Sequence, residues 1–283
     1  MSRLVRGALS LSVVAVAAGI GAAVFRVLPE LGANGLLHPS RRPLTAARPD
    51  GCQDAEFGDS ALRLRGWRCA TTASFRGTIV YLHGIADNRA SAVGVIQRFR
   101  PRGFDVIAYD SRGHGQSDGD TCTYGFFERN DLKAILDTVQ RGPIVLIGTS
   151  LGAAVALQEA AADRRVAALV AAETFSDLRT VATERAPFVF TSTSIRRAFQ
   201  LAEGRGQFRV DAVSPLAAAP SIVCPVLMIH GEMDRDTPPD HSKRVFEALR
   251  GDKQLLMVPG AGHNGSMTPA VWSQVERWID ERL

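Results

Sequence analysis

Short aliphatic runs alternate with longer, mixed stretches along most of this chain. The runs do not switch between polar and apolar residues, which is typical of strands covered by helices on both faces. They lie at residues 78–83, 104–109, 143–148, 166–171, 225–230 and 253–258. The mixed stretches predict helices over residues 88–100, 126–141, 151–163, 241–250 and 268–282. This alternation predicts a doubly wound, mostly parallel sheet of the α/β class.

One interval breaks the alternation, because no strand is evident between residues 173 and 222. It reads as short helices and loops, and so long an insertion between two strands suggests a small helical cap over the carboxyl edge of the sheet. We place this cap at about residues 174–222. The alternative is an irregular connection with no role. The cap holds apolar side chains that suit either an acyl chain or packing onto the body: Phe175, Phe188, Val189, Phe190 and Phe199.

The amino terminus has the pattern of a membrane segment. Arg3 and Arg6 precede nineteen uncharged residues, Gly7 to Phe25, and a helix of that length spans about 28 Å, close to one hydrocarbon core. We expect residues 1–28 to be a transmembrane anchor that leaves the rest of the chain exported. The alternative is a cleaved secretory signal, because small residues at 15–17 and 21–23 could precede a cleavage site. A third reading is a buried core helix.

Residues 29–50 contain several prolines and arginines and predict an extended linker. The remaining residues, 51–283, fit a single main domain, since large α/β folds often reach about 250 residues as one unit. The net positive charge of the chain comes from its first 50 residues. Residues 1–50 hold six arginines and two acidic residues, which accounts for the whole net charge of +4. The balanced remainder shows no basic stripe, so we expect no nucleic-acid partner. We also expect a monomer.

Four cysteines are too few to define the fold. Cys52 and Cys69 flank a turn signal, Gly58-Asp59-Ser60, between two short predicted strands, so their sulfurs could lie opposite each other. Export would permit a disulfide between them. Two free buried thiols are the open alternative.

A Gly-x-Ser-x-Gly pattern places Ser150 between the predicted strand 143–148 and an alanine-rich helix. This is the setting of a nucleophile elbow, in which Gly148 and Gly152 allow strand and helix to approach closely and the serine sits on a strained backbone. The amides of Ser150 and Leu151 lie at the helix start, where N–H groups favour an oxyanion. Ser150 is therefore a candidate nucleophile.

A serine hydroxyl needs a base, and the base needs a carboxylate that fixes its tautomer. His263 follows the last predicted strand, and Asp234 follows the strand before it, so both should meet Ser150 at the carboxyl edge of the sheet. The chain order serine, aspartate, histidine is the order that such a triad takes on an α/β sheet. Asp236 is the alternative acid. A second acid and imidazole pair, Asp110 and His114, reads as loop scaffolding.

The motifs "YLHGIADN", "YDSRGHGQSDG", "TYGFFERNDL", "GTSLG", "HGEMDRDTPPDHS" and "GAGHN" follow one another in this order. From Cys52 to the carboxyl end, the chain resembles the α/β-hydrolase superfamily, and within it the membrane-linked serine hydrolases of the abhydrolase and Bem46-like type. The resemblance implies a nucleophile at Ser150, an acid at Asp234 and a base at His263. It also implies an oxyanion hole from the amides of Ile85 and Leu151. The glycine run of many lipases is missing after "HG", so a simple two-donor hole is expected.

The sequence thus predicts a serine hydrolase that cleaves an ester, thioester or amide bond of a small-molecule or lipid-like acyl substrate. Acyl transfer or peptidase action by the same triad, and a non-catalytic binding protein on this fold, remain alternatives. No cluster of histidines or cysteines has metal-ligand spacing, and no dinucleotide fingerprint is present. We therefore expect no metal and no cofactor.

Overall fold

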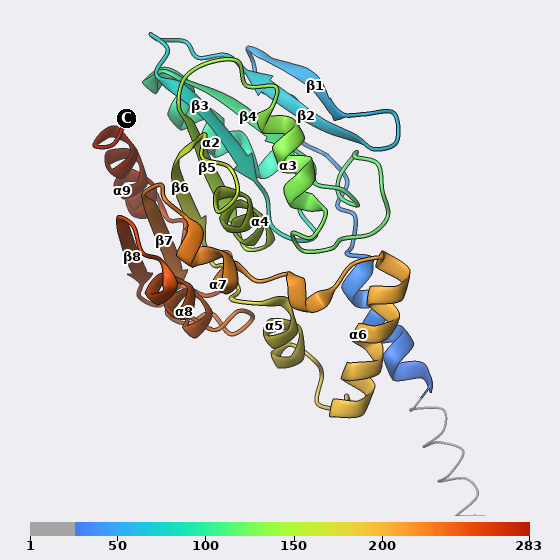
Figure 1. Cartoon of the computed structure of the whole chain (residues 1–283). Coiled ribbons are helices and arrows are strands. Elements are labelled where there is room, and N and C mark those ends of the chain that lie inside the picture. Colours follow the sequence, from blue (N-terminus) through green and yellow to red (C-terminus); the bar gives the residue numbers. More distant parts are fainter. Residues whose placement is uncertain (1–25) are drawn as a thin grey trace, which may run out of the picture.

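The computed structural model describes residues 26–283, and an eight-stranded sheet forms its centre (Figure 1). The strand order is β1-β2-β4-β3-β5-β6-β7-β8. β2 runs antiparallel to both of its neighbours, and the pairs from β4 to β8 are parallel, which confirms the predicted mostly parallel sheet. The strands are β1 (Cys52–Gly58), β2 (Arg63–Cys69), β3 (Gly77–Leu82), β4 (Phe104–Tyr109), β5 (Ile144–Thr149), β6 (Val166–Ala172), β7 (Val226–Gly231) and β8 (Lys253–Val258).

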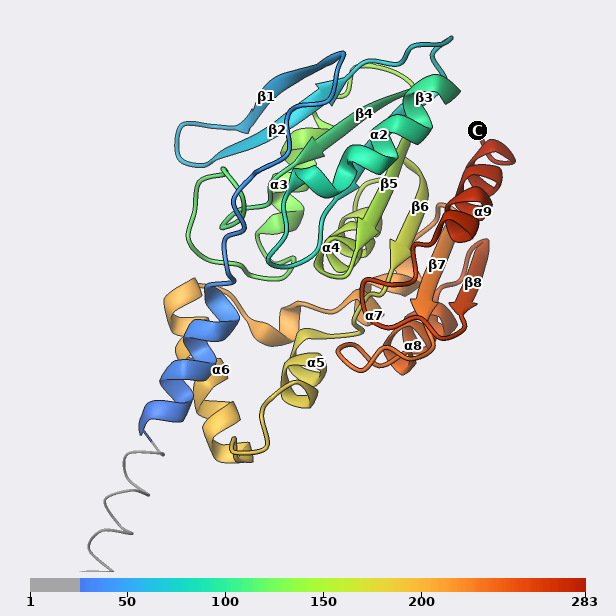
Figure 2. The ribbon, with the colours of Figure 1, turned by 180° about the vertical axis from the view of Figure 1, so that it is seen from behind.

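Helices cover both faces of the sheet, which is why strands such as β3 and β7 are apolar and buried along their whole length. One face packs against α2 (Val93–Phe99) and α9 (Pro269–Asp280), seen from the front in Figure 2. The other face packs against α3 (Glu128–Leu136), α4 (Leu151–Ala160) and α8 (Asp240–Ala248). Two short 3-10 turns, η1 (Arg89–Ala92) and η2 (Arg100–Arg102), flank α2.

The segment between β6 and β7 is helical; α5 and α6 lie beyond the carboxyl edge of the sheet, where both views show them, whereas α7 packs against α4 and α8 (Figures 1 and 2). Its elements are α5 (Leu178–Glu184), α6 (Ser192–Gly206), η3 (Val210–Ala212), α7 (Pro215–Ala218) and η4 (Ala219–Ser221). Of the apolar side chains noted in its sequence, Phe175 is buried against Tyr124, whereas Phe188 is 98% exposed.

The structure differs from the linker predicted over residues 29–50. Residues 26–37 form a helix, here called the 26–37 helix, that packs beside α6, and only residues 38–50 lack regular structure. Gly32 explains the close packing, because a Cβ there would lie 2.9 Å from the Cβ of Ala198 on α6. Arg205 of α6 also pairs with Glu30, at 2.6 Å. The helix is therefore part of the folded body.

The predicted membrane segment, residues 7–25, lies outside the described residues. Within residues 26–283, no helix combines the length and the hydropathy that crossing a bilayer requires. Cys52 and Cys69 are directly opposite on β1 and β2, and their sulfurs are bonded, as the turn between the two strands suggested. Cys122 and Cys224 are free and buried.

Candidate active site

Ser150 stands on a sharp turn between β5 and α4. Its φ of 49° and ψ of −113° are a conformation that non-glycine residues rarely adopt. The turn needs glycines on both sides. A Cβ at Gly148 would lie 2.5 Å from the carbonyl carbon of Gly152, and a Cβ at Gly152 would lie 2.2 Å from the carbonyl oxygen of Leu82. The sequence setting of a nucleophile elbow is thus matched by the backbone geometry.

The structure brings His263 between Ser150 and Asp234. The Nε2 atom of His263 lies 3.1 Å from the Ser150 hydroxyl, and its Nδ1 atom lies 2.7 Å from the Asp234 carboxylate. Each residue follows the end of a parallel strand, β5, β7 or β8, so the three converge at one edge of the sheet. Because the carboxylate accepts the Nδ1 proton, Nε2 is free to accept the proton of the serine.

Asp234 is buried and held as an anion. Burial alone would raise the pKa of its carboxyl, but hydrogen bonds from His230, from His263 and from the amide of Thr237 outweigh it and hold the pKa below its usual range. The His230 Nε2 atom lies 3.2 Å from Asp234 and 2.8 Å from the Thr237 carbonyl. Both are acceptors, so this nitrogen carries the proton. The acid next to His263 is therefore charged and fixed in place.

Glu173, which sequence reasoning did not assign to the site, lies directly after β6. It is 2% exposed, and its carboxylate accepts hydrogen bonds from the amides of Asn264 at 2.6 Å and Ser266 at 3.1 Å. The same carboxylate lies 3.9 Å from Nδ1 of His263. Glu173 thus ties down the loop that carries His263 and adds negative charge beside the imidazole. Its position just after an apolar strand is the signal that could have pointed to it.

Among the backbone amides near Ser150, some already donate a hydrogen bond within the protein and others are available to an oxyanion. The amide of Ser150 itself donates to the Ala172 carbonyl at 2.8 Å, so it is not available to an oxyanion, contrary to the sequence expectation. Leu151 is the first residue of α4, and its amide has no carbonyl one turn earlier in the helix. Within the described residues, neither this amide nor that of Ile85 donates a hydrogen bond. These two are the donors that the resemblance implied.

The other sequence candidates lie in structural roles. Asp110 forms a buried ion pair with Arg89 and also accepts from the amide of Gln116 at 2.8 Å. The Nδ1 atom of His114 donates to the Arg112 carbonyl at 2.9 Å. Burial, and next the nearby His83, lower the pKa of His114 to about 4. This acid and imidazole pair therefore holds a loop together.

Asp236, the alternative acid, is exposed, whereas both oxygens of Asp234 are engaged in the site. One set of described residues has ligand atoms close enough to hold a metal ion: Glu173, Asp234 and His263, within 4.8 Å of one another. Protein hydrogen bonds already use these atoms, because the Glu173 oxygens accept two amides and the Nδ1 proton of His263 lies between the imidazole and Asp234. The donor set therefore fits a hydrogen-bonded triad better than a metal site.

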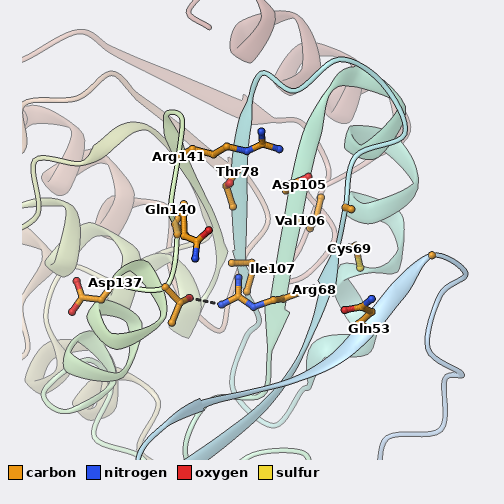
Figure 3. A pocket seen from close by; sticks show the side chains of 14 residues that line it. Gln53, Arg68, Cys69, Thr78, Asp105, Val106, Ile107, Asp137, Gln140 and Arg141 are labelled. Atoms are coloured by element: carbon orange, nitrogen blue, oxygen red, sulfur yellow. Dashed lines mark hydrogen bonds between the residues drawn. The ribbon is translucent and has the colours of Figure 1, made fainter.

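An open cavity of about 550 Å³ lies over Ser150 and His263. Its lining also includes Ile85 and residues of the end of α5, of the loop after β7 and of the loop after β8: Glu184, Arg185, Arg235, Asp236 and Asn264. A larger cavity, of about 760 Å³, lies beside the β1–β2 disulfide (Figure 3). There Arg68 donates to the Thr138 hydroxyl, and no residue of the triad contributes to the lining. Of these two cavities, the one over Ser150 is lined by two members of the candidate triad, Ser150 and His263.

Comparisons with known proteins agree with this fold. A family model described as alpha/beta hydrolase fold matches residues 77–191, and a model described as TAP-like protein matches residues 207–281. The uncharacterized protein YqkD of Bacillus subtilis (strain 168) is 34% identical over 201 residues, which are 68% of this chain and 66% of YqkD. The monoglyceride lipase of Rattus norvegicus is 25% identical over 291 residues, 87% of this chain and 95% of the lipase.

Among solved structures, the esterase Pf2001 of Pyrococcus furiosus superposes with a TM-score of 0.71 at 23% identity, covering 87% of this chain and 99% of the esterase. The mouse alpha/beta hydrolase domain-containing protein 10 superposes with a TM-score of 0.64 at 25% identity, covering 81% and 99%. The sheet order, the sharp turn at Ser150 and the family models all lead to one assignment. The chain belongs to the α/β-hydrolase superfamily.

Proposed function

We propose that this protein is a serine hydrolase that cleaves an ester, thioester or amide bond through an acyl-enzyme. The single observation that carries the proposal is the placement of His263, which lies within hydrogen-bond distance of both Ser150 and Asp234. The strained turn at Ser150 and the open cavity above it support the same conclusion.

In this mechanism, Ser150 Oγ attacks the substrate carbonyl while Nε2 of His263 takes its proton. Asp234 holds the imidazole in the required tautomer and stabilises the imidazolium that forms. The amides of Ile85 and Leu151 stabilise the negative oxygen of the tetrahedral intermediate. His263 then gives the proton to the leaving group. Water, activated by the same imidazole, attacks the acyl-enzyme and restores Ser150.

The triad itself supports hydrolysis, acyl transfer and peptide cleavage equally, since all three pass through the same acyl-enzyme. The fate of that intermediate separates them. Incubation with an activated ester and an added alcohol or amine will give only the free acid if water is the acceptor. A transacylated product would favour an acyltransferase.

The experiment that tests the proposal is turnover of a p-nitrophenyl ester by Ser150→Ala and by Ser273→Ala, a matched change on α9 away from the site. We expect Ser150→Ala to lose at least about 10³-fold in kcat/KM, because the nucleophile is gone. Ser273→Ala should retain full activity. Equal turnover by the wild type and Ser150→Ala would refute the nucleophile, and the absence of any turnover would favour the non-catalytic alternative.

We further propose that residues 7–25 anchor this domain in a membrane, with the domain on the exported side. The 26–37 helix follows that segment directly, and apolar side chains are exposed on it and on the connection from α5 to α6: Val27, Leu31, Phe188 and Val189. A disulfide suits an oxidising compartment. The full chain should stay in the membrane pellet after alkaline carbonate extraction. A mature protein that begins near residue 18 or 24 and is released would show a cleaved signal instead.

A further inference from the structure

A second cavity, of about 440 Å³, lies between the 26–37 helix, α5 and α6. Its walls are mainly apolar and include Leu31, Leu36, Val181, Phe190, Ile195 and Phe199. The cavity lies within the usual volume range of small-molecule sites, and mostly apolar walls with few polar groups are typical of them. The predicted cap supplies only some of the walls of this cavity. The 26–37 helix, which composition assigned to a linker, supplies another wall.

This apolar cavity adjoins the catalytic cavity. Ile85 and Arg185 belong to the lining of both. The guanidinium of Arg185 is already engaged, since it donates to the Asp236 carbonyl at 2.6 Å and to the Thr237 hydroxyl at 2.7 Å. A chain that leads away from a carbonyl at Ser150 past Ile85 would therefore run towards the apolar cavity.

The surrounding helices are held in place and yet leave this space open. Arg179 lies over the ring of Phe199, at 4.9 Å from its centroid, and Glu30 pairs with Arg205 across the two helices. Nevertheless, a Cβ added at Gly35, which lines the cavity, would meet no atom within 4 Å. Fixed apolar walls around open space are what a preformed site for an apolar ligand requires.

We propose that this cavity binds the acyl chain of the substrate, so that the enzyme acts on esters or thioesters of medium or long fatty acids. The inference rests on the proposed function, because it takes Ser150 as the point where the acyl group is attached. Each buried methylene of the chain is expected to contribute about fourfold to kcat/KM. The 26–37 helix is then part of the acyl-chain site, so the segment next to the predicted membrane anchor takes part in recognising the substrate.

The test compares p-nitrophenyl octanoate with p-nitrophenyl acetate, using the full chain in one non-ionic detergent. Two variants fill the cavity from different helices: Ala182→Trp on α5 and Gly35→Trp on the 26–37 helix. Gly204→Trp is the matched control, because Gly204 is an exposed position of α6 outside the cavity, where a Cβ also meets nothing within 4 Å. Thermal unfolding identifies any variant that does not fold.

We expect the wild type to prefer the octanoate, and the ratio of octanoate to acetate kcat/KM to fall about tenfold or more in a folded cavity-filling variant. Gly204→Trp should keep the wild-type ratio. Turnover of both esters with a ratio that neither filling changes would overturn the acyl-chain site and leave the proposed function standing. No turnover of any ester by the folded wild type would overturn both.

Discussion

Glu173→Gln is expected to reduce catalysis without changing any atom of the triad. The glutamine is neutral and keeps one acceptor oxygen, so both amides that Glu173 now binds, those of Asn264 and Ser266, lose their charged partner, and one of them loses its acceptor. A hydrogen bond to a charged group contributes about 1.5–3 kcal/mol, which loosens the loop carrying His263. The carboxylate is also 3.9 Å from Nδ1, and unit charges at that distance interact by at most about 4 kcal/mol at an effective dielectric constant of 20. We expect kcat/KM to fall about ten- to hundredfold.

The assay is ester hydrolysis as a function of pH, with denaturant unfolding measured on the same samples. Removing a negative charge beside His263 destabilises the imidazolium, so the acid limb of the kcat/KM profile should move to lower pH. A purely structural role would reduce stability without that movement. Glu232→Gln, which changes an exposed carboxylate after β7, is the matched control. If Glu173→Gln keeps kcat/KM within about twofold and the same pH profile, the positioning role is refuted.

Three further predictions concern stability, measured by denaturant unfolding. Gly152→Ala places a Cβ 2.2 Å from the Leu82 carbonyl and should lower the free energy of unfolding by about 2–3 kcal/mol. Gly94→Ala is the control, because a Cβ there meets no atom within 4 Å, and equal stabilities of the two variants would contradict the tight elbow. The double change of Cys52 and Cys69 to serine should cost about 3 kcal/mol, because the bond closes a separation of 17 residues; no loss would mean that the thiols are free. His114 has a folded pKa of about 4, below its usual value, so its contribution to the free energy of unfolding is complete above about pH 6.5 and is lost as pH falls towards 4, by up to about 3 kcal/mol. His114→Asn should weaken this pH dependence of stability, and an unchanged dependence would assign it to other groups.

The sequence predicted the sheet well because a strand that is buried on both faces is a continuous apolar run in the sequence. The run 104–109 is β4, and 78–83 is β3 within one residue. Helix ends were less accurate. The helix expected over 126–141 spans only Glu128–Leu136, and the one expected over 88–100 is a 3-10 turn followed by α2. Helix ends depend on caps and on tertiary packing, which an apolar pattern does not record.

The 26–37 helix was missed because the prolines and arginines of residues 29–50 suggested an extended linker. Its buried positions, Pro29, Ala33 and Leu37, are spaced four residues apart, which is a helical signal that this composition obscured. Gly32 does not loosen this helix but allows it to contact α6. Such a role depends on a partner helix that is more than 150 residues away in the chain.

In the site, motif order and strand ends predicted where Ser150, Asp234 and His263 come together, since the topology of a parallel sheet brings strand ends to one edge. The use of amides could not be predicted, because the acceptor of the Ser150 amide, the Ala172 carbonyl, lies on a neighbouring strand. Glu173 was likewise hidden, since its partners are backbone amides of a distant loop, and backbone groups leave no pattern in the residue types.

The central claim is that Ser150 is an activated nucleophile, and covalent labelling tests it most directly. The folded full chain is treated with a fluorophosphonate probe, digested, and the modified peptide is located by mass spectrometry. We predict a single adduct on Ser150, which His263→Ala greatly slows. A label on another residue, or an unmodified Ser150 in protein shown to be folded, would contradict the account.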